Sequence, residues 1–183
     1  FSADGFGKFG ALDVSEDWAD EARRYYIGIV GKYGAQVQAL LKKAAALEIE
    51  TICPLHGPVL TGDALAEALR LYDLWSRWQS EAPEEILLAH ASIHGNTARA
   101  AELLKQKLEA KGARVTLCDL TTTEVSYAVA NAFYCGKLVL ACSTYDGGLF
   151  PPMEEFLTHL QAKGFRSRSV GLMENGSWAP AAA

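Results

Sequence analysis

The second half of the chain alternates short apolar runs with segments of helical character, and this order restricts the possible folds more than any other feature. The apolar runs are continuous, as in strands that are covered on both faces. They are "ILLAHA" (86–91), "RVTLCDL" (114–120), "KLVLACS" (137–143) and "RSVGLMEN" (168–175). The intervening segments predict helices over 98–110, 125–131 and 153–161, although 121–131 could also be a loop with a short helical turn. Strands and helices in this order form right-handed βαβ units, so we expect an α/β, doubly wound domain with a parallel sheet.

In the first half of the chain, apolar residues recur every three or four positions over long stretches, which is the spacing of a helix. One long helix is predicted from Ser15, its N-cap, through Leu41, with a break near Gly31–Gly34. "IETICP" (49–54) predicts a short strand, and a second helix is expected to begin with Asp63 as its cap. This pattern predicts a mainly helical unit.

The charged segment "EAPEE" (81–85) separates these two patterns. It contains a proline and lies between the second helix and the first long apolar run. We therefore predict a domain boundary near Ala82–Glu84, with domains over 1–82 and 83–183.

Composition excludes several classes of function. A content of 50% hydrophobic residues over 183 residues fits packed cores, and a net charge of −5 with no basic cluster argues against a nucleic-acid partner. No apolar run is long enough to span a membrane, and no signal peptide is recognisable, so we expect no membrane association and a cytoplasmic protein. The four cysteines form no CxxC pair and predict reduced, mostly buried thiols. The abrupt ends, "FSADG" and "WAPAAA", are those expected of a fragment.

Three loops at the carboxyl ends of the predicted strands carry residues suited to a ligand. In open parallel sheets, ligands bind at this edge, where the strand order reverses. "SIHGNT" (92–97) places hydroxyl, amide and glycine residues before a helix, where free N–H groups favour an anion. It lacks the spaced glycines of GxGxxG and the lysine of GxxxxGK[ST], so a phosphate monoester is the better candidate. "STYDGGLFPP" (143–152) and "ENGSWAP" (174–180) add Tyr145 and Trp178, although each loop alone could be a simple turn.

The loop around His56 is the corresponding feature of the first half. Pro54 and Pro58 enclose it in "CPLHGPVL" and hold it in a stiff, non-helical conformation. A histidine in such a turn can be structural, or it can serve as a metal ligand or an acid/base group. His90, His94 and His159 lie in the second half, in strand, loop and helix contexts that packing or solvent exposure explains.

The three loops together resemble those of the flavodoxin-like domain, whose first loop has the form [ST]x[TYH]GNT. The resemblance implies that the first loop holds the phosphate of FMN and that the later loops contact its ribityl chain and ring. The implied phosphate residues are Ser92, Ile93, His94, Gly95, Asn96 and Thr97. The implied ribityl and ring residues are Ser143, Thr144, Tyr145, Asp146, Gly147, Gly148, Asn175, Gly176, Ser177 and Trp178.

Motifs of the first half extend the resemblance to the flavodiiron proteins (A-type flavoproteins). "FSADGFGKFG" is similar to their FSxDAFGxFG, with Gly5 in place of alanine, "CPLHGPVL" to their xPxHGPVW, and "LYDLWSRW" to their YDKWS before the flavodoxin domain. The resemblance implies a metallo-β-lactamase-like αββα domain, present in its C-terminal part, followed by an incomplete flavodoxin-like domain. It also implies a non-haem di-iron centre in which Asp4 bridges the irons and His56 ligates one of them, with the other ligands upstream of this sequence.

The resemblance implies an oxidoreductase. Electrons would pass from FMN to the di-iron site, which would reduce oxygen to water or nitric oxide to nitrous oxide. A rubredoxin-like donor and a head-to-tail homodimer or tetramer are implied as well. Two alternatives remain: a flavodoxin-type electron carrier without metal chemistry, and a metallo-β-lactamase-like hydrolase with an accessory domain.

Overall fold

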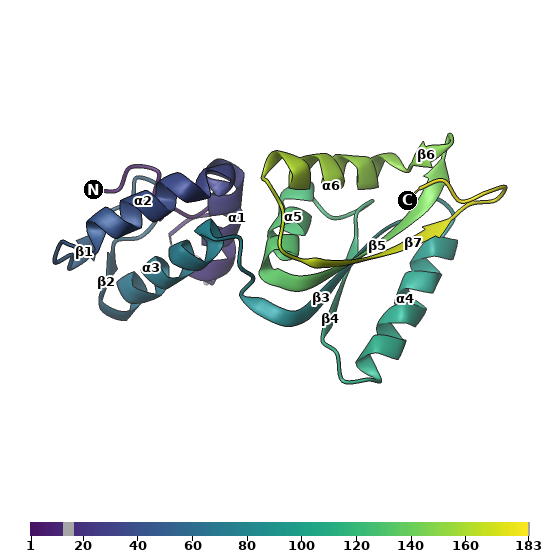
Figure 1. Ribbon diagram of the computed structural model, residues 1–183, viewed down its shortest axis with the longest axis horizontal. Coiled ribbons are helices and arrows are strands. Elements are labelled where there is room, and N and C mark those ends of the chain that lie inside the picture. The colour runs from purple at the N-terminus through teal and green to yellow at the C-terminus, as the bar shows by residue number, and fades with distance from the viewer. Residues whose placement is uncertain (13–16, 183) are drawn as a thin grey trace. The chain divides into compact units, whose positions relative to one another are not determined.

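The computed structural model describes residues 1–12 and 17–182 and divides into two units, Phe1–Gln79 and Ser80–Ala183 (Figure 1). The division lies slightly before the predicted boundary between residues 82 and 83. Residues 82–85 of the charged segment that marked this boundary belong to the first strand of the second unit, β3 (Ala82–Ala91). Its first residue, Ala82, pairs with Cys135, and the register shifts before Ile86.

The second unit is built on a parallel sheet, which confirms the predicted fold class. Its strands are β3, β4 (Val115–Asp119), β5 (Cys135–Tyr145) and β7 (Ser169–Asn175), in the spatial order β4-β3-β5-β7. All three pairings among them are parallel. The two-residue strand β6 (Gly148–Leu149) adds an antiparallel pair at the end of β5. The chain order reverses between β3 and β5, which is the position where ligands bind in sheets of this type.

Helices cover both faces of this sheet (Figure 1). They are α4 (Asn96–Glu109) on one face and α5 (Val125–Tyr134) and α6 (Pro151–Ala162) on the other. Beneath α4, a core forms from Leu88, Ala101 and Ala141, all of them fully buried. Because both faces are covered, the strands need apolar residues at successive positions, which explains the continuous runs in the sequence.

The start of β3 passes very close to β5. A β-carbon built at Gly136 would lie 2.2 Å from the carbonyl oxygen of Pro83, so only glycine fits there. Pro83 and Glu84 are thus part of the sheet, although their residue types are unusual for a strand interior. They lie at its margin, where the side chain of Glu84 is 81% exposed and pairs with Lys137 at 2.7 Å.

The first unit is mainly helical. Helix α1 (Trp18–Ile29) is followed by the 3₁₀ turn η1 (Gly31–Tyr33) and by α2 (Gly34–Ala44), so the predicted break near Gly31–Gly34 is confirmed. The cap of α1 is Asp17, whose side chain accepts the N–H of Ala19 at 3.0 Å. The predicted cap, Ser15, lies outside the described residues.

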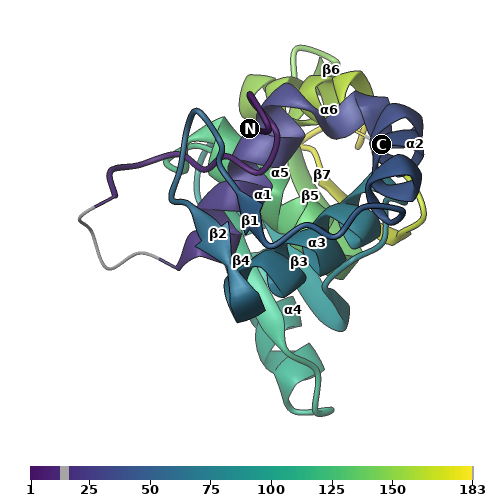
Figure 2. The ribbon, with the colours of Figure 1, turned by 90° about the vertical axis from the view of Figure 1, so that its left-hand side faces the viewer.

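Helix α3 (Gly62–Ser76) of this unit follows the antiparallel pair β1 (Thr51–Ile52) and β2 (Leu60–Thr61). Figure 2 brings this unit to the front and shows α2 and α3 together with β1 and β2. The prediction that Asp63 caps α3 was wrong: Thr61, in extended conformation, occupies the N-cap position and Asp63 lies in the first turn.

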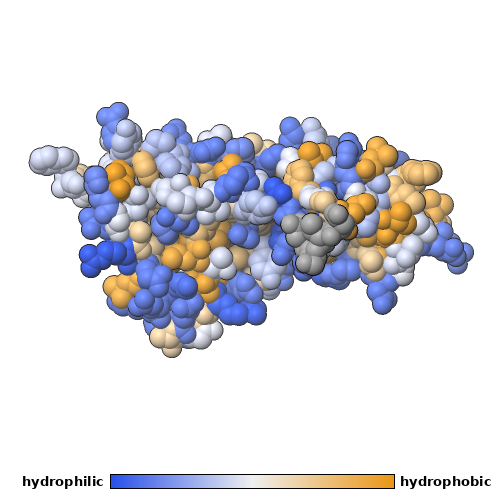
Figure 3. Space-filling view, turned by 180° about the vertical axis from the view of Figure 1, so that it is seen from behind, coloured by the Kyte–Doolittle hydropathy of each residue, from blue (hydrophilic) through white to orange (hydrophobic). Residues whose placement is uncertain are grey.

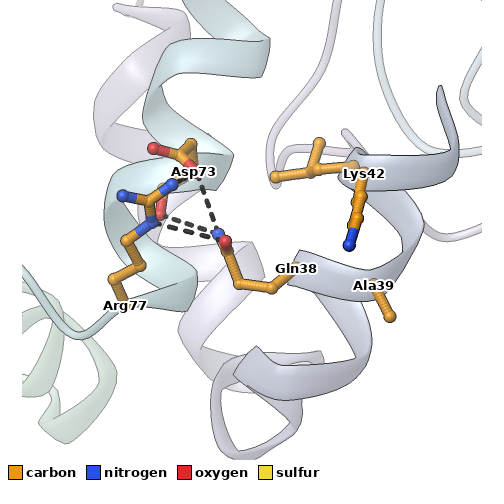
Figure 4. A pocket seen from close by; sticks show the side chains of 6 residues that line it. Gln38, Ala39, Lys42, Asp73 and Arg77 are labelled. Carbon is orange, nitrogen blue, oxygen red and sulfur yellow. Dashed lines mark hydrogen bonds and ion pairs between the residues drawn. The ribbon is translucent and has the colours of Figure 1, made fainter. Parts of the chain in front are cut away.

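Polar side chains connect α2 to α3 (Figure 4). The Gln38 amide donates to Asp73 Oδ1 at 2.9 Å and to Ser76 Oγ at 2.7 Å, and Arg77 donates to Asp73 and to Gln38. These groups line an open pocket of about 530 Å³, with Lys42 on its α2 side. Because the polar groups here bond chiefly to one another, the network fixes α3 against α2.

Apolar side chains also reach the surface of each unit (Figure 3). They include Leu55 and Val59 in the first unit and Val170 and Leu172 in the second.

Within the described residues, no helix has the length and apolar character needed to cross a bilayer. All four cysteines are free thiols, and three of them are buried, as the sequence predicts.

Candidate functional site

The loop after β3 has the geometry of an anion-binding helix start. Gly95 adopts a left-handed conformation, with φ 82°, and α4 begins at the next residue. The first N–H groups of a helix lack partners within the helix, and the helix dipole adds positive charge there. The hydroxyl oxygen of Ser92 is buried and has no hydrogen-bond partner among the described residues. An acceptor-rich group such as a phosphate would satisfy both the hydroxyl and the free N–H groups, so the loop fits the predicted ligand.

Thr97 connects the three predicted loops. Its hydroxyl lies 2.8 Å from that of Ser143 at the end of β5, and it accepts the side-chain N–H of Asn175 at the end of β7 at 3.3 Å. Thr97 is 1% exposed and Ser143 is 8% exposed. The hydroxyl of Thr97 thus forms its hydrogen bonds within the protein. The group of Thr97 that remains for a ligand is its backbone N–H, in the first turn of α4.

The second loop leaves β5 as a tight turn. Asp146 and Gly147 both have positive φ, 47° and 76°, and they return the chain to β6. Tyr145 is 50% exposed and tilts against Phe150, with ring centroids 5.8 Å apart. Its ring is therefore accessible to a flat ligand while one edge is supported by the fold.

The third loop follows β7 and returns to β5. The N–H of Ala181 donates to the Thr144 hydroxyl at 3.0 Å, and Trp178 is fully exposed. Gly176 lies so close to Ala179 that an added β-carbon would be 2.6 Å from its carbonyl oxygen. The predicted ring-contacting residues therefore lie on two connected loops of one sheet edge.

In the first unit, the structure brings Asp4 and His56 together. Asp4 Oδ1 lies 3.4 Å from His56 Nε2, and the two side chains are about equally exposed, at 62% and 58%. Backbone hydrogen bonds join the two segments on either side of this contact. The N–H of Ser2 donates to the Cys53 carbonyl, that of Leu55 to Ala3 and that of Lys8 to His56. In this arrangement, the Asp4 carboxylate and the His56 Nε2 atom are close enough to contact the same ion.

This pair fits two ligands of a metal but does not make a complete site. Carboxylate and neutral imidazole suit iron and zinc alike. Within residues 1–12 and 17–182, however, no group of three or more histidine, cysteine, aspartate or glutamate side chains could hold an ion. The other predicted ligands would have to come from outside this sequence.

Two tyrosines beside the pair were not among the predicted site residues. The ring of Tyr25 lies 6.1 Å from that of His56, and burial together with the nearby Asp4 carboxylate raises the pKa of Tyr25. Tyr72, on α3, accepts the N–H of Phe6, two residues after Asp4. In the sequence, Tyr72 could have been noticed only by its position in the "LYDLWSRW" motif.

The remaining histidines occupy the contexts that the sequence predicts. His90 is buried in β3 with Nδ1 3.9 Å from Asp119 Oδ1, His94 is exposed in the phosphate-type loop, and His159 is exposed on α6. None of them belongs to a group of metal-binding side chains within the described part of the chain.

Comparisons with known proteins cover nearly the whole chain. No protein-family profile matches it. Putative diflavin flavoprotein A 3 of Synechocystis is 27% identical over 169 residues, which are 89% of this chain and 28% of that protein. Putative diflavin flavoprotein A 6 of Nostoc is 25% identical over 166 residues, 89% of this chain and 29% of that protein. The chain thus spans less than a third of the length of these curated relatives.

Solved structures give the same result for the fold. The flavodiiron protein of Giardia intestinalis matches with a TM-score of 0.89 and 25% identity, over 100% of this chain and 46% of that one. Rubredoxin oxygen:oxidoreductase of Desulfovibrio gigas matches with a TM-score of 0.86 and 21% identity, over 97% and 46%. The chain therefore shares its fold with solved flavodiiron proteins and resembles curated diflavin flavoproteins in sequence, and it corresponds to about half of the length of those solved structures.

Proposed function

We propose that the protein containing this chain passes electrons from FMN to a non-haem di-iron site, which reduces oxygen to water or nitric oxide to nitrous oxide. One observation carries the proposal: Asp4 and His56 converge within 3.4 Å in a chain whose second unit has a phosphate-type loop at the switch point of its sheet. In this proposal, the first unit is the C-terminal part of a metallo-β-lactamase-like domain, and the second is a flavodoxin-like domain.

The chain's own groups would hold FMN at the carboxyl edge of the sheet. The buried hydroxyl of Ser92 and the N–H groups at the start of α4 would bind the phosphate. The loops after β5 and β7 would contact the ribityl chain and ring, with Tyr145 and Trp178 as the exposed aromatic groups. Bound FMN supplies one- and two-electron transfer, while these residues orient it and exclude water.

The chain's contribution to the metal site would be two ligands. Asp4 offers two carboxylate oxygens, so it can bridge two ions, and His56 would ligate through Nε2 as the neutral imidazole. Iron supplies the binding and reduction of a diatomic gas. Because further ligands are needed, we place them in a part of the protein that precedes this sequence.

The name of the Desulfovibrio gigas protein supports oxygen as a substrate and a rubredoxin-type electron donor. We extend both to this protein, together with a homodimer or tetramer. A flavodoxin-type electron carrier is the second candidate, because the order of the four parallel strands in the second unit matches the first four strands of the flavodoxin-like order, with the same switch point for FMN.

The deciding experiment measures iron, zinc and flavin in the protein in its natural, complete form. About two irons and one FMN per chain are expected, together with consumption of oxygen or nitric oxide when a reduced donor is supplied. FMN without metal would favour the electron carrier. Zinc without flavin would favour a hydrolase and contradict the proposal.

FMN binding by the second unit has its own test. Replacing Ser92 with alanine removes the buried hydroxyl, and a hydrogen bond to a charged phosphate contributes roughly 1.5–3 kcal/mol, so FMN affinity should fall by about tenfold or more. The matched control is Ser169→Ala, at the opposite end of the sheet, which should bind FMN like the unmodified chain. Riboflavin, which lacks the phosphate, should bind both variants equally. Equal FMN affinities would place the phosphate elsewhere.

A further inference from the structure

The segment that carries Asp4 has a strained backbone. Ala3 and Phe6, on either side of Asp4, both adopt positive φ, at 50° and 65°. This left-handed conformation is unfavourable for an L-residue, because its β-carbon crowds the following carbonyl. Neither residue is a glycine, so contacts from elsewhere must hold this conformation.

Hydrogen bonds to the segment around His56, and one within the turn itself, hold the N-terminal side of the segment that carries Asp4. Ser2 and Ala3 bond to Cys53 and Leu55, and the Ser2 hydroxyl donates to the carbonyl of Gly5 at 2.8 Å. None of these bonds engages the N–H of Phe6. That group points instead to α3, where it donates to the hydroxyl oxygen of Tyr72 at 2.5 Å.

Tyr72 fixes the side chain of Phe6 as well. The two rings are stacked, with centroids 4.1 Å apart and planes 24° apart. Tyr72 is 3% exposed and packs against Tyr26 and Trp75, whose ring centroids lie 4.9 and 5.5 Å away. Burial raises the pKa of Tyr72, so its hydroxyl stays neutral, and its oxygen accepts the N–H of Phe6 in that form.

We propose that Tyr72 is a positioning residue for the metal site: its hydroxyl and ring hold Phe6 in the left-handed conformation and so aim the Asp4 carboxylate at His56. The inference rests on the proposed function, because it assigns Tyr72 to the geometry of the same ligand pair. Partners that orient metal ligands commonly affect metal affinity by roughly 10- to 100-fold.

A matched pair of variants tests this role. Tyr72→Phe removes the hydroxyl that accepts from Phe6 and keeps the stacked ring. Tyr26→Phe removes a hydroxyl from the same aromatic cluster, one that is buried and has no partner among the described residues. In the complete protein loaded with iron, we expect a chelator to capture iron from Tyr72→Phe at least tenfold faster than from the unmodified protein. Tyr26→Phe should release it at the unmodified rate.

A double variant separates positioning from a general loss of stability. Glycine adopts positive φ without the steric cost, so Ala3→Gly, which relieves strain beside Asp4 and keeps the Phe6 ring, combined with Tyr72→Phe should release iron more slowly than Tyr72→Phe alone. This comparison also serves if Tyr72→Phe folds poorly, since the double variant can then be compared directly with the unmodified protein.

The outcomes are distinct. Rapid release confined to Tyr72→Phe and slowed in the double variant supports the inference. Iron in the unmodified protein with equal release from Tyr72→Phe and Tyr26→Phe overturns it and leaves the proposed function intact. An unmodified protein that holds no metal overturns both. Release from the double variant as fast as from Tyr72→Phe shows that the hydroxyl does not hold the left-handed backbone, and it too overturns the inference.

Discussion

The candidate flavin loops all leave the same edge of one parallel sheet, whereas the segment that carries Asp4 belongs to no sheet and reaches His56 through individual backbone hydrogen bonds. The polar groups that connect the flavin loops, Thr97 and Ser143, are almost completely buried. The side chains of Asp4 and His56 remain more than half exposed.

The difference shows two ways of building a site. Parallel strands place their carboxyl ends together by topology, so ligand groups placed just after the strands converge without special contacts. Two loops outside a sheet converge only where specific bonds oppose their conformational entropy and backbone strain. We therefore expect the site of Asp4 and His56 in the first unit, the first site, to be more sensitive to small backbone changes than the flavin loops of the second unit, the second site.

The largest effect is expected at Gly7, between the two segments of the first site. A β-carbon there would lie 2.8 Å from the carbonyl oxygen of His56 and 2.9 Å from the ring of Tyr25. Gly7→Ala should lower the free energy of unfolding of the first unit by about 3 kcal/mol, near the upper end for overpacking. Urea unfolding followed by tryptophan fluorescence measures it.

The control is Gly28→Ala, in α1, where an added β-carbon would be 3.9 Å from the Phe9 ring, an ordinary contact. It should be neutral or raise the free energy of unfolding by about 0.5 kcal/mol, because alanine favours helix. Equal destabilisation by both variants would contradict the close approach of the two segments at Gly7.

A smaller effect is expected at Thr97 in the second site. Thr97→Val keeps the shape but leaves the hydroxyl of Ser143 and the amide of Asn175 without their partner. The free energy of unfolding of the second unit should fall by about 1–2 kcal/mol, the usual result of stranding buried polar groups. Circular dichroism during urea unfolding measures it.

Thr122→Val is the matched control, since Thr122 is exposed and its hydroxyl donates to the Asp119 carbonyl at a long 3.4 Å. It should change stability by less than about 0.5 kcal/mol. If Thr97→Val were equally mild, the buried hydroxyl would not connect the three loops.

The reactivity of the cysteine thiols compares how accessible the interiors of the two units are to a reagent. Cys118, Cys135 and Cys142 of the second unit are buried, and burial raises the pKa of Cys118 and Cys142. Cys53, in the first unit beside the His56 loop, is partly exposed. We expect a disulfide reagent to label Cys53 at least tenfold faster than the other three in the native protein, because only an accessible thiolate reacts. Rapid labelling of Cys142 would show that the sheet edge opens.

The smallest effect concerns a surface ion pair of the first unit. Hydrogen bonds from Arg70 lower the pKa of Glu67 in the folded chain. A carboxyl with a lowered folded-state pKa stabilises the fold above its ordinary pKa, and this contribution is lost as the pH falls through the lowered value. Because both side chains are about half exposed, Arg70→Gln should cost only about 0.3 kcal/mol at pH 7 and nothing at strongly acidic pH. Thermal unfolding at several pH values tests this sign.

Most of the second unit could be predicted from the sequence. The order of its strands and helices follows from apolar periodicity, because each segment must present a fixed face to the core. The predicted strand begins at Ile86, whereas β3 begins at Ala82, because charged residues and a proline are tolerated at the margin of a sheet, where Glu84 remains in water. Asp63 was misassigned since its residue type suits a cap, whereas the backbone places Thr61 at that position.

The sequence by itself determined which residue types stand at the end of each strand, and these residue types are the basis of the ligand that we propose for the second unit. Only the tertiary structure decided that the Thr97 hydroxyl faces Ser143, that Asp4 meets His56, and that Tyr72 accepts the N–H of Phe6, two residues after Asp4. The reason is physical. Periodicity reports how each segment partitions between core and water, whereas contacts between distant side chains depend on how whole elements pack, which no single segment encodes.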